Sequence, residues 1–536
     1  METVEGLFKR LEQLNDIGVS LSRERDLDRL LEKILLAAKA ITRADGGTLY
    51  RISEDRQRLC FEIVRTDSLG IAFGGASSTP VSSKFPDVVL YRDDGSPNDS
   101  NVAAYAAMTG KTVNIADAYE AEGFDFSGTR KFDAGTGYRS KSFLTVPMKN
   151  HEGEIIGVLQ LLNAIDPQDG KVTVFSKADQ RLAESLASQA AIALTNRHLL
   201  LQLEELFESF IRLINTAIDD KSPYTGGHCQ RVPELTMLLA EAVNETAEGP
   251  LAEFKLTEKD RYELKIAALL HDCGKVTTPV HVVDKATKLQ TIFDRIGLLD
   301  TRFEVLKREA EIDMLRAVAS GGDPGEQERR YRLRIGLYDQ DRTFLHRVNI
   351  GGERMSDEDV ARVQRIGRDY KWRNEAGEEV PFLTDDEVEN LTIRGGTLTQ
   401  KEREIINHHI VATIKMLEQL PWPRHLENVP EYAGGHHERM DGKGYPKGLK
   451  REEMSWQARM MGIADIFEAL TAKDRPYKEA MKLSQALAIM ENFKNGGHID
   501  PDLFAVFMDK RVFSAYAERF LDASQIDVGQ ARAVEN

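Results

Sequence analysis

The chain has 536 residues, of which 41% are hydrophobic and 29% are charged, and its formal net charge is −16. This length predicts several domains, and the composition is typical of folded globular proteins. The acidic surplus excludes a protein that coats a nucleic-acid polymer, because such a protein needs basic residues to neutralise the phosphates. The sequence has no run of about 18 uncharged apolar residues, so we expect no membrane span. Three scattered cysteines favour a reducing compartment, and we expect a cytoplasmic protein.

The N-terminal part of the chain predicts an antiparallel sheet with helices at its ends. Apolar residues recur at helical spacing in two stretches, residues 4–21 and 26–41. Four stretches with strand character form two predicted hairpins, residues 47–52 with 59–64 and residues 142–148 with 155–162. This order is typical of an α+β domain.

The segment from residue 24 to 196 resembles the GAF family of small-molecule sensor domains, and residues 1–23 form a separate helix before it. The resemblance rests on residues 142–150, 157–163 and 175–179. Cyclic-nucleotide-binding members share a dispersed signature, which is matched here by Asn163, Phe175 and Asp179. Ala164 replaces its lysine and Gln180 its glutamate, so the salt bridge of that signature cannot form. The resemblance implies a small-molecule or cyclic-nucleotide ligand, or a GAF fold that dimerises without one.

Residues 176–220 predict one long connecting helix that overlaps the end of the GAF-like segment. Its apolar stripe advances in steps of three and four residues, is interrupted at Asn196, and continues through Leu199, Leu203, Leu206, Phe210 and Leu213. A helix that outlasts the domain it closes favours a parallel coiled coil between two protomers. An ordinary packed helix is the alternative. The arrangement resembles the signalling helix between sensor and output domains and implies a homodimer.

Two histidine motifs in the C-terminal half predict a metal site. His436 and His437 precede a glycine-rich turn, and His271 with Asp272 closes an apolar helix. Imidazole is the commonest metal ligand in proteins, and a carboxylate can bridge two cations. Lys275 lies four residues beyond His271, where its ammonium could reach a phosphate oxygen. A buried His-Asp pair without a metal and a solvated lysine are the alternatives.

These motifs resemble the HD-GYP family, all-helical His-Asp metallophosphohydrolases that hydrolyse the bacterial second messenger cyclic di-GMP. We place this domain at residues 221–515, followed by a C-terminal tail at 516–536. The resemblance implies seven metal ligands: His228, His271, Asp272, His409, His436, His437 and Asp465. His408 competes with His409 for one position, and the family's spacing favours His409.

The resemblance also implies two divalent cations, and mixed nitrogen and oxygen ligands favour Fe or Mn over a closed zinc site. Tyr224 stands where members with three metals carry a further glutamate. Catalytic roles fall to Asp272 and Lys275, and substrate contacts fall to Lys275, Arg475 and Lys478. The loop that gives the family its name is expected to form the pocket wall or to bind a protein partner, and consists of Asp441, Gly442, Gly444, Tyr445 and Pro446.

The implied activity is hydrolysis of cyclic di-GMP to linear pGpG, or onward to GMP, by a phosphodiesterase under GAF control. The same centre could instead act on another cyclic dinucleotide or on a nucleotide phosphate. A catalytically silent signalling scaffold is the alternative from a different class of protein.

Residues 290–397 are predicted to be an insertion within the helical domain, because the segments on either side look like two halves of one short connection. Inside the insertion we expect a helical hairpin of residues 292–319 with 326–338, and short strands near 380–383. The insertion is expected to be a lid or a partner surface, and a neutral surface addition is the alternative.

Overall fold

The computed structural model describes residues 4–24, 26–76, 79–81, 85–221, 227–352, 354–374, 376–473 and 481–528. The chain divides into two compact units, Met1–Leu206 and Phe207–Asn536. The helix α5 (Lys177–Lys221) contributes to both units and confirms the predicted connecting helix. None of the described helices combines the length and the apolar character that crossing a membrane requires.

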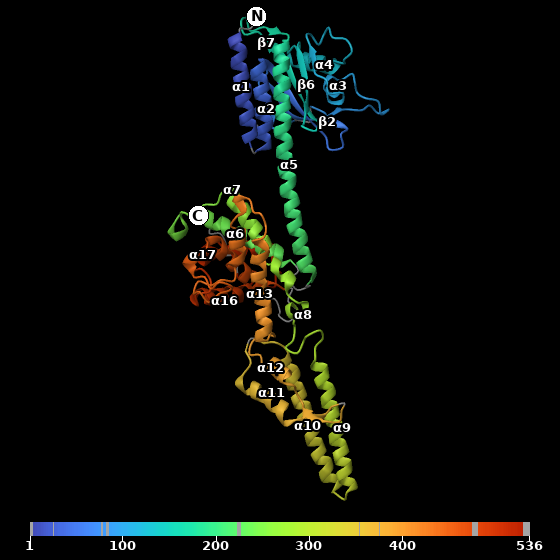
Figure 1. Cartoon of the computed structure of the whole chain (residues 1–536), viewed down its shortest axis with the longest axis vertical. Helices are drawn as coiled ribbons and strands as arrows, with labels where there is room; N and C mark the ends of the chain where they lie inside the picture. The colour runs from blue at the N-terminus through green and yellow to red at the C-terminus, as the bar shows by residue number, and fades with distance from the viewer. Residues whose placement is uncertain are drawn as a thin grey trace. The chain divides into compact units, whose positions relative to one another are not determined.

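The first unit is built on an antiparallel sheet (Figure 1). Its strand order is β3-β2-β1-β7-β6-β5, with β4 beside β2 and β8 beside β7. The strands are β1 (Ala44–Ile52), β2 (Arg58–Thr66), β3 (Ile71–Gly74), β4 (Val88–Val89), β5 (Val113–Ile115), β6 (Phe143–Lys149), β7 (Ile155–Ile165) and β8 (Val172–Thr173). The pairing of β1 with β2 and of β6 with β7 confirms the two predicted hairpins.

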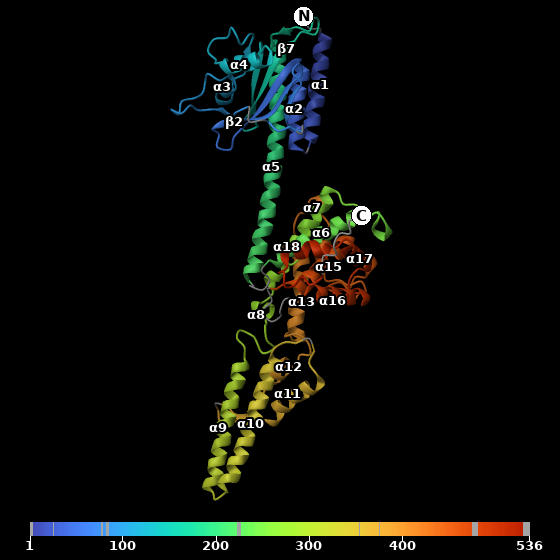
Figure 2. The same ribbon diagram turned by 180° about the vertical axis from the view of Figure 1, so that it is seen from behind.

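Helices cover both faces of this sheet (Figures 1 and 2). One face packs against α1 (Val4–Arg23), α2 (Leu27–Thr42) and α5, and the other side carries α3 (Val102–Thr109) and α4 (Ser127–Thr136). The N-terminus of α2 is capped by the Asp26 carboxylate, which accepts the Arg29 N–H. Its inward stripe recurs every four residues and includes Leu30, Ile34 and Ala38, all of which are buried. This order and pairing confirm the predicted α+β class.

Asp179, one of the three residues that match the cyclic-nucleotide signature, joins the helices of the first unit. Its carboxylate lies 2.5 Å from the Arg10 guanidinium and 3.5 Å from that of Arg43. It also accepts hydrogen bonds from the Ser176 N–H and hydroxyl. Position 164, where the signature has lysine, is an alanine in β7. Arginines from α1 and from the end of α2 therefore neutralise Asp179 in place of that lysine.

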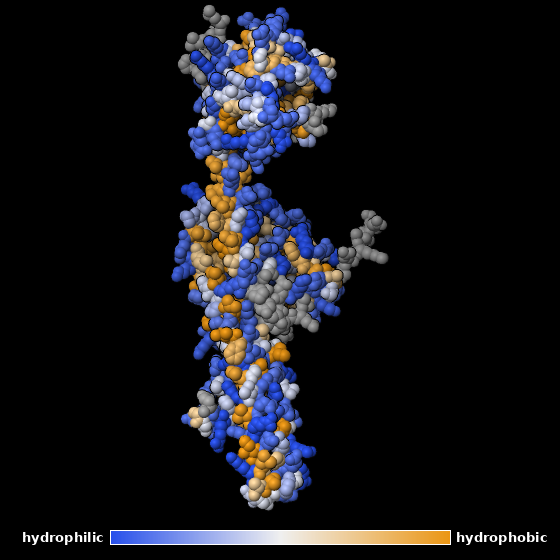
Figure 3. Space-filling model, turned by 90° about the vertical axis from the view of Figure 1, so that its right-hand side faces the viewer, coloured by the Kyte–Doolittle hydropathy of each residue, from blue (hydrophilic) through white to orange (hydrophobic). Residues whose placement is uncertain are grey.

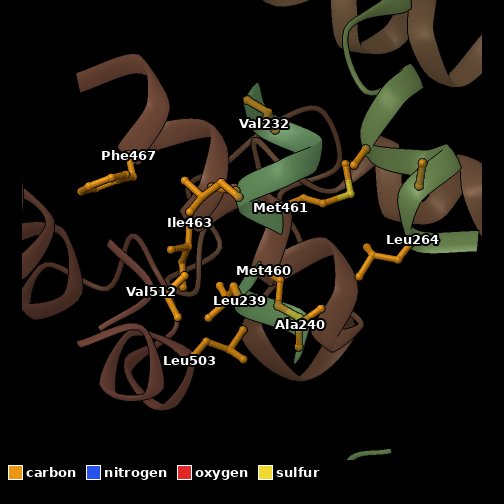
Figure 4. Packing of buried hydrophobic residues seen from close by; sticks show 14 of the residues in the cluster. Val232, Leu239, Ala240, Leu264, Met460, Met461, Ile463, Phe467, Leu503 and Val512 are labelled. Carbon is orange, nitrogen blue, oxygen red and sulfur yellow. The ribbon is translucent and has the colours of Figure 1, made fainter. Parts of the chain in front are cut away.

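In the residues that the structure describes, the second unit is helical apart from one short ribbon of two strands. Its main helices are α6 (His228–Asn244), α7 (Glu258–Leu270), α8 (Val280–Val283), α13 (Gln400–Leu417), α14 (Val429–Gly434), α15 (Trp456–Thr471), α16 (Leu483–Asn495), α17 (Pro501–Asp509) and α18 (Val512–Phe520). Figure 4 shows α6, α7 and α15 packing together through residues such as Val232, Leu264 and Met461. The core also includes Tyr516 and Ala517, so α18 continues past residue 515, where we predicted that the domain ends.

The insertion has a hydrophobic core of its own, which includes Phe303, Leu345 and Phe382. The predicted hairpin is confirmed as α9 (Ile296–Ala319) and α10 (Pro324–Asn349), and the predicted strands as β9 (Lys371–Arg373) and β10 (Glu379–Pro381). Two further helices, α11 (Asp357–Asp369) and α12 (Asp385–Leu391), complete it.

A buried lysine ties this insertion to the helix that follows it. Lys285 is 1% exposed, and its ammonium lies 2.7 Å from Asn390 Oδ1 in α12 and 2.8 Å from the Glu402 carboxylate in α13. Glu402 also forms the capping box of α13 with Thr399. Through Lys285, the insertion is therefore linked to the N-terminal turn of the helix that carries His409.

Candidate metal centre

The seven predicted ligand residues lie in one cluster of the second unit. They come from the first residue of α6 (His228), the segment directly after α7 (His271 and Asp272), the middle of α13 (His409), the segment after α14 (His436 and His437) and the middle of α15 (Asp465). The close approach of two of these segments depends on Gly274, since a Cβ atom there would lie 2.0 Å from the His409 carbonyl oxygen. No side chain larger than hydrogen fits at that contact.

Two groups of side chains have the spacing of metal ligands: His228 with His271 and Asp272, and His409 with His436 and His437. The Asp272 carboxylate faces both groups. Its Oδ2 lies 3.0 Å from His228 Nε2 and 3.3 Å from His271 Nε2, and its Oδ1 lies 3.3 Å from His409 Nε2. Asp465 Oδ1 lies 3.3 Å from His228 Nε2. This is the arrangement that a carboxylate shared by two cations requires.

Backbone carbonyls fix the orientation of three of the imidazole rings. His271, His409 and His436 each place Nδ1 between 2.5 and 2.7 Å from the carbonyl oxygen three residues earlier. A carbonyl can only accept a hydrogen bond, so each Nδ1 carries the proton and each Nε2 is left as an unprotonated nitrogen. The lone pairs of these rings therefore point into the cluster, as metal ligation requires.

Unpaired acceptors in the cluster fit a bound cation. Among the described residues, His436 Nε2 and Asp272 Oδ1 are buried without a hydrogen-bond partner, an arrangement that costs about 1–3 kcal/mol for each group. The Nε2 atoms of His409 and His437 face each other at 3.2 Å. A divalent cation would satisfy these atoms together, since imidazole nitrogens and carboxylate oxygens are both metal ligands. The residues present thus fit the cofactor.

The electrostatics keep most of these groups in the protonation state of a ligand. Burial acts to raise the pKa of the Asp272 carboxyl, but Lys275 and His271 hold that pKa well below its usual range. Burial lowers the pKa of His437 to about 4 and holds the pKa of His436 well below its usual value. Lys275 Nζ lies 2.5 Å from Asp272 Oδ2. The cluster therefore presents a carboxylate anion and neutral imidazoles.

His228 differs, and its proton makes cation binding dependent on pH. Burial acts to lower the pKa of His228, but Glu468, Asp272 and Asp465 raise it well above 6.5. His228 is thus protonated below that raised pKa, and the proton on Nε2 competes with a cation. We predict that Mn²⁺ affinity, measured by isothermal titration calorimetry in several buffers, falls by about tenfold per pH unit as the pH drops through neutrality, with release of one proton per ion bound. Affinity that does not change with pH would contradict this assignment.

Glu468 supports the centre and was not predicted. Its Oε2 lies 2.6 Å from His228 Nδ1, and its Oε1 accepts from Arg231 Nε at 2.7 Å. Glu468 follows Asp465 by three residues on α15, so both carboxylates lie on one face of the helix. That spacing is a signal in the sequence, but the contact with His228 depends on how α6 packs against α15.

We predict that Glu468→Gln weakens Mn²⁺ binding by about 10–100-fold, the range for a residue that orients a metal-bound histidine. The amide keeps the shape of the side chain but removes the carboxylate that binds His228 Nδ1 and so orients the imidazole ring in the cluster. Glu241→Gln is the matched control, because Glu241 forms an ion pair with Arg261 elsewhere in the same unit. Equal Mn²⁺ affinities in the two variants would contradict the role of Glu468.

Two adjoining cavities open onto the cluster. One, of about 330 Å³, is lined by His228, Arg231, Lys275, Ile406, His409, His437, Tyr445, Asp465, Glu468, Ala469 and Ala472. The other, of about 450 Å³, is lined by His437, Arg439, Lys443, Tyr445, Asp465, Ile466, Ala469, Leu470, Phe493 and His498. His437 and Tyr445 line both, and their rings stack at 4.8 Å. Lys275 and Tyr445 thus line the cavity beside the cluster.

The loop after the double histidine is held by hydrogen bonds and an ion pair between its own residues. The Glu438 carboxylate accepts the N–H groups of Lys447 and Leu449, and Asp441 pairs with Arg439 at 2.8 Å. Gly442 has φ +73°. A Cβ atom on Gly444 would lie 2.4 Å from the Arg439 nitrogen. Both glycines are needed for this compact loop, and Pro446 follows Tyr445 through a cis peptide bond.

The remaining predicted residues divide into two cases. Arg475 and Lys478, the expected substrate contacts, and Tyr224 lie outside the described residues. His408 is exposed, whereas its neighbour His409 is 4% exposed and lies in the cluster. Of these two histidines, His409 is the one whose side chain faces Asp272, and it remains the predicted ligand.

Comparison with known proteins agrees with this architecture. A GAF domain model matches residues 26–194, and two HD domain models match residues 225–344 and 353–503. The chain contains a GAF domain and an HD domain. The boundary between the two HD matches falls inside the insertion, and residues 353–503 contain four of the seven clustered residues.

Three relatives of the chain have names that describe cyclic-dinucleotide chemistry. The chain is 40% identical over 110 residues to the 3′3′-cGAMP-specific phosphodiesterase 3 of Vibrio cholerae, an alignment that covers 20% of this chain and 23% of the relative. It is 35% identical over 140 residues to a probable cyclic di-GMP phosphodiesterase of the same organism, with 25% and 31% covered. A cyclic di-GMP phosphodiesterase of Thermotoga maritima is 32% identical over 130 residues, with 24% and 34% covered. The chain thus spans at most about a third of the length of these relatives.

Proposed function

We propose that this chain is a metal-dependent phosphodiesterase that hydrolyses cyclic di-GMP to linear pGpG. The observation that carries the proposal is the buried Asp272 carboxylate, which lies between two groups of histidines. Three of these histidines, His228, His409 and His437, line a cavity. The names of the relatives support a cyclic dinucleotide as the substrate.

Each group of the cluster has a defined part in this proposal. His228, His271 and Asp465 would hold one cation and His409, His436 and His437 the other, with Asp272 shared between them. Two bound divalent cations, Fe or Mn, would supply an activated water and neutralise charge on the phosphate. Lys275 lines the cavity and would add a positive charge beside a phosphate oxygen. Arg475 and Lys478 are proposed to contact phosphate and guanine.

The two cavities suit a ligand with two bases on one phosphodiester ring. Their shared wall, which includes His437, Tyr445 and Asp465, places the cluster at the junction. Tyr445 presents an aromatic ring there, and Arg439 and Lys443 line the second cavity. Lys443 is 78% exposed, so a protein partner at this loop is also part of the proposal.

The substrate is tested by comparing turnover of cyclic di-GMP, 3′3′-cGAMP and pGpG under anaerobic conditions with Fe²⁺ or Mn²⁺. Cyclic di-GMP should be hydrolysed fastest, with pGpG as the product. Faster turnover of 3′3′-cGAMP would favour the second candidate substrate, which the relative with 40% identity supports. Intact substrates in the presence of bound metal would instead indicate a signalling scaffold.

The exposed face of α5 supports a homodimer. Its apolar stripe is solvent-exposed in the single chain: Leu199 (49%), Leu203 (61%), Leu206 (54%), Phe210 (55%) and Leu213 (63%). Figure 3 shows apolar side chains along this helix. The spacing alternates between four and three residues, which is the seam of a coiled coil.

We predict that the double variant Leu203→Glu/Leu206→Glu converts a dimer to a monomer in light scattering, because it places charges in the seam. Gln202→Glu adds a charge at an exposed position beside the stripe and should leave the dimer intact. A double variant that remains dimeric would place the interface elsewhere.

GAF control of the hydrolase completes the proposal. A cavity of about 790 Å³ in the first unit is lined by residues of α2, the ends of β1 and β7, and α5, among them Leu31, Tyr50, Leu194 and His198. A small molecule in this cavity would contact α5 directly. Its binding could then shift the balance between two packings of that helix.

A further inference from the structure

The turn that carries His271, Asp272 and Lys275 is held at both of its ends by α5. It follows α7 and includes the 3-10 turn Cys273–Thr277. The last carbonyls of a helix have no partner within that helix, so whatever binds them fixes the position of the chain that follows. Here the chain that follows α7 begins with His271 and Asp272, two residues of the cluster.

Asn215 binds the first end. Its side-chain amide donates to the Leu269 carbonyl at 2.9 Å, two residues before His271. Asn215 is 5% exposed, between Ile211 and Ile218, which are both in the hydrophobic core. This contact is therefore part of the buried interface between α5 and α7.

Lys221 binds the second end. Its ammonium donates to the Lys275 carbonyl at 3.1 Å and to the Val276 carbonyl at 2.5 Å. These carbonyls belong to the last turn of the 3-10 segment, where a cation is favoured by the exposed carbonyl dipoles. Lys221 is the last residue of α5, so this bond joins the end of the connecting helix to the backbone of Lys275.

The opposite side of the same turn rests on α13. The Gly274 N–H donates to Thr413 Oγ1 at 2.9 Å, and Gly274 touches the backbone of His409. The turn is thus confined between α5 on one side and the helix that carries His409 on the other. A displacement of α5 would pull on the turn while His409 stays with α13, which changes the spacing between the two histidine groups.

We propose that Asn215 and Lys221 are positioning residues that transmit the state of α5 to the metal centre. This inference rests on the proposed function and adds the route by which that site is regulated. Neither side chain reaches the cluster itself, and both act through the backbone of the turn. Loss of either contact is expected to loosen Asp272 relative to His409 and so to weaken cation binding.

The test compares Lys221→Met with Lys221→Arg in the full-length protein. Methionine keeps the aliphatic stem and removes the donor, whereas arginine keeps a cation that can reach both carbonyls. We expect Lys221→Met to weaken Mn²⁺ binding by about tenfold or more, the effect of losing a supporting contact. Lys221→Met should also lower kcat for cyclic di-GMP with little change in KM. In Lys221→Arg, both the Mn²⁺ affinity and kcat should stay close to those of the parent protein.

Lys265→Met is the matched control, since Lys265 also links α7 to α5, through Glu208 at 3.0 Å, but away from the turn. It removes the same charge and should leave Mn²⁺ affinity unchanged. If Lys221→Met binds Mn²⁺ as tightly as Lys265→Met, the inference is overturned. Because Mn²⁺ binding is measured without substrate, a difference between these variants would support the positioning role even if cyclic di-GMP is not hydrolysed. Asn215→Leu gives a second measurement at the other end of the turn.

Discussion

Replacing Asp272 by Asn should reduce hydrolysis of cyclic di-GMP by more than about 100-fold, the upper range for residues that only support a metal ligand. Asp272 is 2% exposed and faces His228, His271 and His409 within 3.3 Å. Asparagine has nearly the same shape but removes the negative charge that both cations would share. The measurement is kcat together with metal content per chain.

The same variant separates a catalytic loss from a folding loss. Asp272 also pairs with Lys275 inside the cluster, so asparagine leaves that ammonium without its carboxylate partner. A thermal unfolding transition that remains cooperative shows that the helical fold survives. An Asp272→Asn protein that keeps both cations and near-normal turnover would rule out the shared carboxylate.

Replacing His409 by Ala should also remove most of the activity, whereas replacing His408 by Ala should leave kcat within about twofold of the parent. The two histidines are neighbours on α13 and differ mainly in direction. His409 is 4% exposed and its Nδ1 is bound to the Ile406 carbonyl, while His408 is exposed. Metal content should fall only in the His409 variant. An inactive His408→Ala with an active His409→Ala would reverse the assignment.

Helices and hairpins that depend on the spacing of apolar residues within one segment were predicted best. The stripe of α5, the hairpin of β6 with β7, and the α9–α10 hairpin all follow from spacing within one segment. The double histidine and the His271-Asp272 pair also point to a metal from residue type alone. These features need no knowledge of which helices pack together.

Several contacts between distant segments were not predicted, because neither local pattern nor the family resemblance points to them. Glu468 contacts His228, and Asp179 pairs with Arg10, but the partners lie far apart in the chain. The same reason applies to Lys221, whose partners are backbone carbonyls that no side-chain motif reveals. At the C-terminus, Tyr516 is fully buried, although residues 516–536 were predicted to form a tail.

The insertion is anchored to α13 through a buried lysine. The buried ammonium of Lys285, just before the insertion, joins Asn390 inside it to Glu402 in α13. Removing one partner of a buried ion pair commonly costs about 3–5 kcal/mol. Its contact with α13 lies two helical turns before His409, so the insertion is built onto the same helix as the metal centre.

We propose that this chain is a two-cation phosphodiesterase for cyclic di-GMP. The most direct measurement is a titration of the metal-stripped, reduced protein with Mn²⁺ while hydrolysis of cyclic di-GMP is followed. We predict no turnover without metal, a plateau at about two Mn²⁺ per chain, and pGpG as the product. Protein that has bound Mn²⁺ but leaves cyclic di-GMP intact would rule out this activity.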